Sequence, residues 1–112
     1  IERVYAHDAD ASRARVFADE MLGRLAVEVD PVRNLSESLR ASDVIVTCTP
    51  SREPFVHVED VAPGTFVAAV GADSPEKQEL DPRVLAASKI VTDIQDQCAE
   101  IGELRKRCTT QV

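Results

Sequence analysis

A carboxylate, Asp73, and an ammonium group, Lys77, lie four residues apart in the segment 71–81. The segment follows residues 65–70, an apolar run with β-branched members that comes after a Pro-Gly turn. This pattern predicts a strand that is buried on both faces. Ligands of open parallel sheets bind beyond the carboxyl ends of the strands, where both side chains would lie. The arrangement therefore favours a ligand site, and a charged surface loop is the alternative.

Segments typical of strands and of helices alternate along the chain. We expect strands at residues 3–7, 25–29, 43–48, 65–70 and 89–92. We expect helices at residues 11–22, 34–41, 81–87 and 94–107, and one helical turn at 57–61. Gly23 would stop the first helix, and Asp93 would cap the last. Strands separated by helices predict an α/β fold with a parallel sheet and right-handed crossovers.

Composition excludes several classes of function. The chain has 112 residues, enough for one domain, and a net charge of −7, which would be repelled by nucleic acid and by anionic membranes. No apolar run approaches the roughly 18 residues of a membrane span. The three cysteines contain no C-x-x-C pair, so neither a disulfide framework nor a metal site is expected, and a cytoplasmic location follows. The chain begins without Met inside a strand, which we interpret as part of a longer protein.

Four motifs agree in order and spacing with one known family. They are residues 43–54, 61–65, 71–81, and the pair 91–93 with 101–104. On these motifs the chain resembles the nucleotide-binding domain of the ornithine cyclodeaminase and mu-crystallin family. The resemblance implies a Rossmann-like three-layer fold, a parallel sheet with helices on both faces. It also implies that residues 1–112 are a partial NAD(P)-binding domain whose first strand and glycine-rich turn lie upstream, and that a substrate and dimerisation domain lies outside this chain.

The resemblance implies an enzyme of amino-acid metabolism that exchanges hydride at a carbon bearing nitrogen. NAD would be its cofactor, with NADP possible, and its substrate a small amino acid or cyclic imine. The activity would be that of an ornithine cyclodeaminase-like ammonia lyase, an amino-acid dehydrogenase or an imine reductase. The full-length protein is expected to be a homodimer, and this chain alone to be inactive. The alternative is a non-catalytic carrier of mu-crystallin type that binds NADP or another small ligand.

Residue roles follow by motif. Asp73 falls on the family's acid/base aspartate, and partial burial in a nicotinamide pocket could tune it for proton transfer. A turn or helix-capping carboxylate is the alternative. Lys77 falls on a lysine that contacts the cofactor. The remaining residues at the two strand ends, which would border the dinucleotide, are Thr47, Cys48, Thr49, Val70 and Gly71.

The end of the first strand departs from the family pattern. Its usual acidic residue, which hydrogen-bonds the adenosine ribose, falls on Ala6. Asp8, two residues later and on the same side of the pleat, is the nearest substitute. We therefore predict that Asp8 binds the ribose, and the choice between NAD and NADP stays open.

Overall fold

The computed structural model describes residues 1–92 and 94–103. The expectations for Asp93 and for residues 104–107 of the last helix lie outside that range. The chain forms two compact units, of which the first comprises residues 1–38 and the second begins at Leu39. Each unit is described by itself below.

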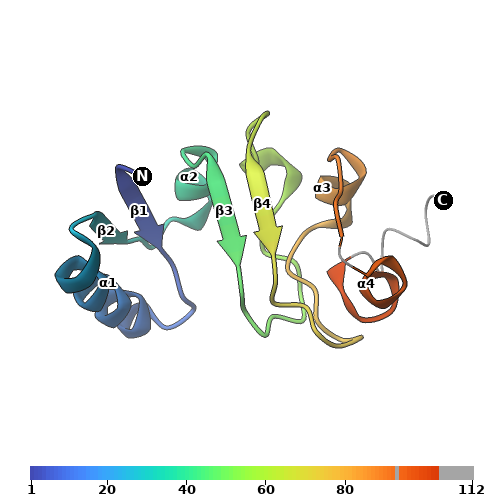
Figure 1. The fold of residues 1–112 in the computed structure, drawn as a ribbon, viewed down its shortest axis with the longest axis horizontal. Helices are drawn as coiled ribbons and strands as arrows, with labels where there is room; N and C mark the ends of the chain where they lie inside the picture. Colours follow the sequence, from blue (N-terminus) through green and yellow to red (C-terminus); the bar gives the residue numbers. More distant parts are fainter. Residues whose placement is uncertain (93, 104–112) are drawn as a thin grey trace. The chain divides into compact units, whose positions relative to one another are not determined.

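The first unit is one strand–helix–strand motif. Strand β1 (Arg3–Ala6) pairs in parallel with β2 (Glu28–Pro31), and helix α1 (Ala11–Leu25) connects them (Figure 1). Asp10 caps α1, because its side chain accepts a hydrogen bond from the backbone N–H of Ser12. This is the parallel α/β connection that the sequence predicts.

Two sequence expectations for this unit are wrong. The helix does not stop at Gly23 but continues to Leu25, and the left-handed turn is made by Ala26, with φ of 51°. A single helical glycine costs only about 1 kcal/mol relative to alanine, which the Arg24–Glu20 ion pair of 3.1 Å partly offsets. The following strand therefore begins three residues later than the predicted 25–29.

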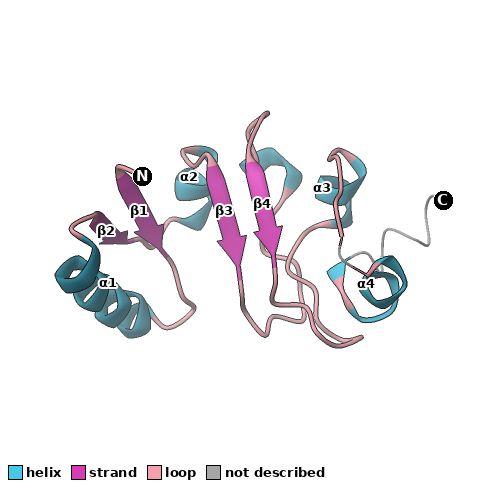
Figure 2. Ribbon diagram, in the orientation of Figure 1, coloured by secondary structure: helices cyan, strands magenta, loops and turns pink. Residues whose placement is uncertain are grey.

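The second unit carries the second pair of strands. Beyond α2 (Leu35–Arg40), the elements are β3 (Val44–Thr47), the 3-10 turn η1 (Val58–Asp60), β4 (Phe66–Ala69), α3 (Pro82–Ala86) and α4 (Gln95–Ile101), as Figure 2 shows. Strands β3 and β4 are parallel, with Val44 opposite Phe66 and Thr47 opposite Ala69. The core of this unit is made by Leu39, Ile45, Val56, Leu80, Val84 and Leu85.

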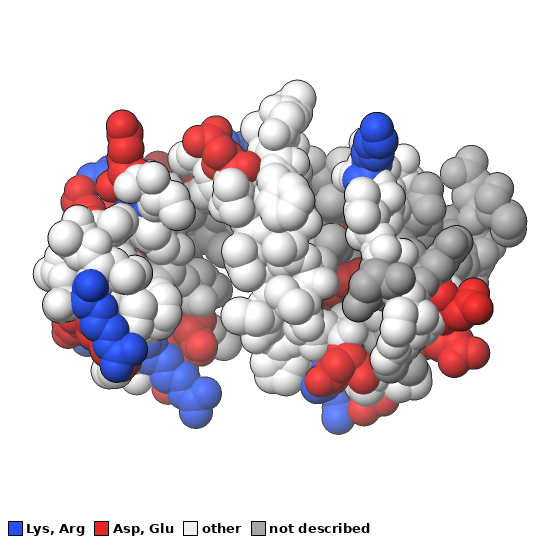
Figure 3. All heavy atoms as spheres, viewed as in Figure 1, with Lys and Arg blue, Asp and Glu red and all other residues white. Residues whose placement is uncertain are grey.

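One face of the β3–β4 sheet is open. Ile45 and Thr47 are buried, whereas Val44 and Val46, which alternate with them along β3, are more than 60% exposed. Phe66 on β4 is 64% exposed, so the expectation that this strand is buried on both faces is wrong. The surface over both strands is largely free of charge (Figure 3). A two-stranded sheet that packs its core on one side leaves the alternate side chains facing solvent.

The expected strand at residues 89–92 does not form. Val91 is 91% exposed, and the segment 89–92 pairs with no strand among the described residues. Its β-branched residues match strand propensity, but that propensity depends on a neighbouring strand. In the described part of the chain, no helix is long and apolar enough to span a membrane.

Candidate functional site

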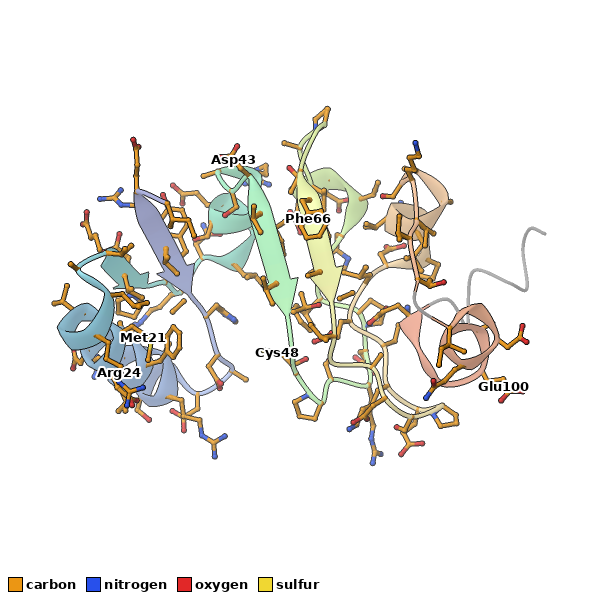
Figure 4. All side chains as sticks on the ribbon, viewed as in Figure 1. Met21, Arg24, Asp43, Cys48, Phe66 and Glu100 are labelled. Atoms are coloured by element: carbon orange, nitrogen blue, oxygen red, sulfur yellow. The ribbon has the colours of Figure 1, made fainter. Side chains whose placement is uncertain are left out.

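The carboxyl ends of β3 and β4 meet at one edge, because the strands are parallel and Thr47 is opposite Ala69. The ladder extends by one more bond, from the N–H of Val70 to the carbonyl of Thr47 at 2.8 Å. Cys48 is exposed at this edge, and Asp43 lies at the other end of β3 (Figure 4). The structure thus brings the predicted strand-end residues together, as the parallel arrangement requires.

Asp73 and Lys77 form an ion pair in the loop that follows β4. The Lys77 ammonium lies 2.7 Å from Asp73 Oδ1. The hydrogen bond and charge of Lys77 lower the pKa of the Asp73 carboxyl below its ordinary value. The Asp73 side chain is 73% exposed, so the described residues do not by themselves provide the partial burial that we expected. The pair therefore presents an ionised carboxylate and a cation side by side.

The threonines at the end of β3 face the protein rather than solvent. Thr47 is 5% exposed, and its hydroxyl has no hydrogen-bond partner among the described residues. Thr49 donates its hydroxyl to Glu79 Oε2 at 2.8 Å and accepts the Ser51 N–H at 3.2 Å. Because the Thr49 proton is already committed, this side chain is not free to donate to a ligand.

Glu79 is the principal residue of this edge that sequence reasoning missed. Its side chain is fully buried, and it accepts hydrogen bonds from the backbone N–H of Thr49 at 2.7 Å and of Gly71 at 2.8 Å. One carboxylate therefore joins the loop after β3 to the loop after β4. No ion pair of Glu79 is found in residues 1–92 and 94–103, so hydrogen bonds offset the cost of its burial.

A second buried carboxylate holds the segment that carries Glu79. Glu103 accepts the backbone N–H of Glu79 at 2.6 Å and of Leu80 at 3.1 Å. It also accepts the Gln78 side-chain amide at 2.7 Å. The same segment pairs with residues 51–56, where Gln78 N–H donates to Ser51 and Asp81 N–H donates to Val56, each at 2.9 Å. The backbone around Glu79 is thus fixed on both sides.

Gly71 is required by this packing. A Cβ there would lie 2.5 Å from Glu79 Oε2 and closer still to the carbonyl oxygen of Thr49. No side chain fits without moving one of them. A glycine directly after a strand is a sequence signal that another group approaches the backbone closely, although it does not say that this group is Glu79.

Asp8 belongs to the first unit. It is exposed, and its Oδ1 accepts the Asp10 N–H at 2.8 Å in the turn after β1. Ala6, at the family's acidic position, is the buried last residue of β1. The Asp8 carboxylate keeps further acceptor sites in solvent, so its predicted role in ribose binding remains compatible with its place.

An apolar hollow lies elsewhere in the second unit. It is bordered by η1, α3 and the residues before β4, among them Val61, Pro63 and Val84. It therefore adjoins the amino end of β4 and is distinct from the candidate site. In the described residues, no group of three or more His, Cys, Asp and Glu side chains could hold a metal ion.

Comparisons with known proteins agree with the resemblance. The model of the ornithine cyclodeaminase/mu-crystallin family matches residues 1–111. An alanine dehydrogenase of Archaeoglobus fulgidus is 40% identical over 105 residues, which are 93% of this chain and 31% of that protein.

Two solved structures are similar across almost the whole chain. An archaeal alanine dehydrogenase dimer with bound NAD gives a TM-score of 0.89 at 38% identity, over 97% of this chain and 33% of that one. The pyrroline-2-carboxylate reductase of Thermococcus litoralis, in complex with NADH and L-proline, gives 0.91 at 29% identity, over 97% and 34%. The chain thus spans about a third of the length of these relatives and has the Rossmann-like α/β fold. It belongs to the ornithine cyclodeaminase/mu-crystallin family.

Proposed function

We propose that the chain is the nucleotide-binding part of an NAD(P)-dependent oxidoreductase that acts on a small amino acid or cyclic imine. The observation that carries this proposal is the match of 97% of the chain to an alanine dehydrogenase with NAD and to a pyrroline-2-carboxylate reductase with NADH. NAD is the proposed cofactor, because both of those proteins hold it. A homodimer is the proposed assembly, and the cytoplasmic location stays a prediction from the sequence.

The strand edge of the second unit suits a dinucleotide. Cys48 and Val70 are exposed there and offer apolar contact to a planar ring, and Lys77 offers a cation to a ribose hydroxyl or phosphate. When bound, the dinucleotide supplies the hydride chemistry. The chain's own contribution is to orient the ring and to hold a proton acceptor, the Asp73 carboxylate, beside it.

Lys77 and Asp73 are coupled in this scheme. The cation that lowers the pKa of Asp73 is the same group that is proposed to contact the cofactor. When Lys77 turns to the cofactor, Asp73 loses its partner, and its pKa rises toward the ordinary value. A carboxylate whose pKa has risen in this way is a better base for the substrate nitrogen or for a water.

Which reaction the whole protein performs is tested by its products. The full-length protein is incubated with NAD and L-alanine, L-proline or L-ornithine, and reduced nicotinamide and ammonia are measured separately. Dehydrogenation changes nicotinamide absorbance, whereas cyclodeamination releases ammonia with no net change. We expect dehydrogenation, because the two solved structures that match 97% of the chain are a dehydrogenase and a reductase. Ammonia release alone would establish the lyase reaction instead.

The acid/base role is tested by Asp73→Asn in the full-length protein. We expect turnover to fall by about 100-fold or more, since general acid–base catalysis contributes about 10² to 10⁴. Binding of NADH, followed by its fluorescence, should be retained. Asp43→Asn is the matched control, because Asp43 is an exposed carboxylate at the opposite end of β3 (Figure 4). Unchanged turnover in Asp73→Asn would contradict the acid/base assignment of Asp73.

A further inference from the structure

Two loops at the strand edge are held by a single buried carboxylate. Glu79 is 0% exposed, and its two oxygens are divided between the loops. Oε2 accepts the N–H and hydroxyl of Thr49, and Oε1 accepts the N–H of Gly71, all within 2.7 to 2.8 Å. Two residues after Gly71 comes Asp73. Glu79 thus fixes the start of the loop that carries the proposed proton acceptor.

This arrangement is more than simple core packing. A buried carboxylate with no ion pair in the described residues is costly, and an apolar side chain would fill the same space without that cost. What an apolar side chain could not do is accept three hydrogen bonds that set the distance between two loops. Glu103 in turn accepts the backbone N–H of Glu79 and so fixes the backbone from which the Glu79 carboxylate extends.

We infer that Glu79 is a positioning residue for the reaction. It holds the backbones of Thr49 and Gly71 so that Asp73 and the exposed strand-end residues Cys48 and Val70 face the same bound molecule. This inference rests on the proposed function. Glu79 is not itself a catalytic residue, because it is fully buried and, among the described residues, its carboxylate accepts hydrogen bonds from Thr49 and Gly71. Removing it therefore changes the geometry of turnover more than the binding of cofactor.

The test is Glu79→Gln in the full-length protein. The glutamine amide keeps one acceptor oxygen, but its NH₂ group faces the donors of either Thr49 or Gly71 and cannot accept from them. One of the two loops therefore loses its hydrogen bonds to residue 79. We expect kcat to fall by about tenfold or more, since a shift of about 1 Å can cost 10²-fold, while the Kd for NADH rises by no more than about threefold. Glu76→Gln is the matched control, because Glu76 is an exposed carboxylate three residues earlier and should keep both values.

Both constants are measured at a temperature at which all variants are folded. Equal kcat in Glu79→Gln and Glu76→Gln would overturn the inference, even if the melting temperature falls, because that result would make Glu79 only structural. If Glu79→Gln does not fold, Thr49→Val decides, since it removes the hydroxyl bond to Glu79 and, besides that, only the longer bond that the hydroxyl accepts from the Ser51 N–H. An unchanged kcat in Thr49→Val would then overturn the inference, and a decrease of about threefold or more would support it.

The unchanged protein separates this inference from the proposed function. If it neither binds NADH nor turns over L-alanine, L-proline or L-ornithine with NAD, the proposed function fails, and the inference with it. If it does both and the variants match their control, only the positioning role of Glu79 fails.

Discussion

Individual carboxylates of this chain differ widely in their surroundings. Asp73 is exposed and paired with a lysine, whereas Glu79 is fully buried and, in the part of the chain that the structure describes, accepts hydrogen bonds from backbone and hydroxyl donors. Asp81 is of a third kind, because it caps helix α3 and pairs with Arg83 at 2.9 Å. A residue type alone therefore does not tell whether an acidic side chain serves chemistry, positioning or helix stability.

Asp81 provides a prediction of pH dependence. Hydrogen bonds from the Arg83 side chain and backbone lower its pKa from 3.8 to about 2. A lowered pKa stabilises the fold above the unfolded value of 3.8, and this contribution is lost as the pH falls through about 2. We expect Asp81→Ala to reduce the free energy of unfolding by about 1 kcal/mol at pH 7, as for other helix caps. Urea unfolding at several pH values measures this.

The difference between Asp81→Ala and the unchanged chain should shrink between pH 4 and pH 2, because only the unchanged chain loses an ionised cap there. A constant difference across that range would contradict the assigned cause. Asp96→Ala in the first turn of α4 controls for the loss of an acidic side chain, since Asp96 is exposed.

Local rules predicted most of the elements of this chain but not all of their ends. The cap at Asp81 with Pro82 at the first helical position was readable, because both residues favour a helix start for intrinsic reasons. The prediction that the helix ends at Gly23 was wrong, since a glycine inside a helix costs only about 1 kcal/mol, and the left-handed position falls on Ala26. The strand at residues 89–92 could not be excluded from the sequence, because its failure depends on a partner strand and not on its own residues.

Helix α1 gives a prediction about its glycine. Gly23 lies inside the helix, and an added Cβ would meet nothing within 4 Å. Gly23→Ala should therefore raise the free energy of unfolding by about 0.5 to 1 kcal/mol, because alanine loses less backbone entropy. Gly64→Ala is the contrasting variant, since Gly64 is equally uncrowded but has φ of 85°. Gly64→Ala should lower the free energy of unfolding by about 1 to 2 kcal/mol. Chemical denaturation of both variants measures the two changes.

The edge of the second unit shows which part of a site comes from the sequence and which from the whole fold. The spacing of Asp73 and Lys77 and the strand ends were visible in the sequence, since a strand followed by a loop is a local pattern. Glu79 and Glu103 were not, because each looks like an ordinary solvated acid. Their burial arises only when residues 78–81 pair with residues 51–56, which are distant in sequence. The whole molecule thus adds the groups that hold the site.

The open face of the β3–β4 sheet leads to a prediction for the whole molecule. Val44, Val46, Phe66 and Val70 are each more than 60% exposed, and contiguous apolar surface of this kind favours association. We expect the 112-residue chain to form larger species as its concentration rises, measured by sedimentation velocity. Val46→Lys should suppress this association, at a cost of about 0.5 kcal/mol in stability. Ala86→Lys adds the same charge at an exposed position on α3 and should leave it unchanged. A chain that sediments as a monomer at every concentration would show that this face does not mediate self-association.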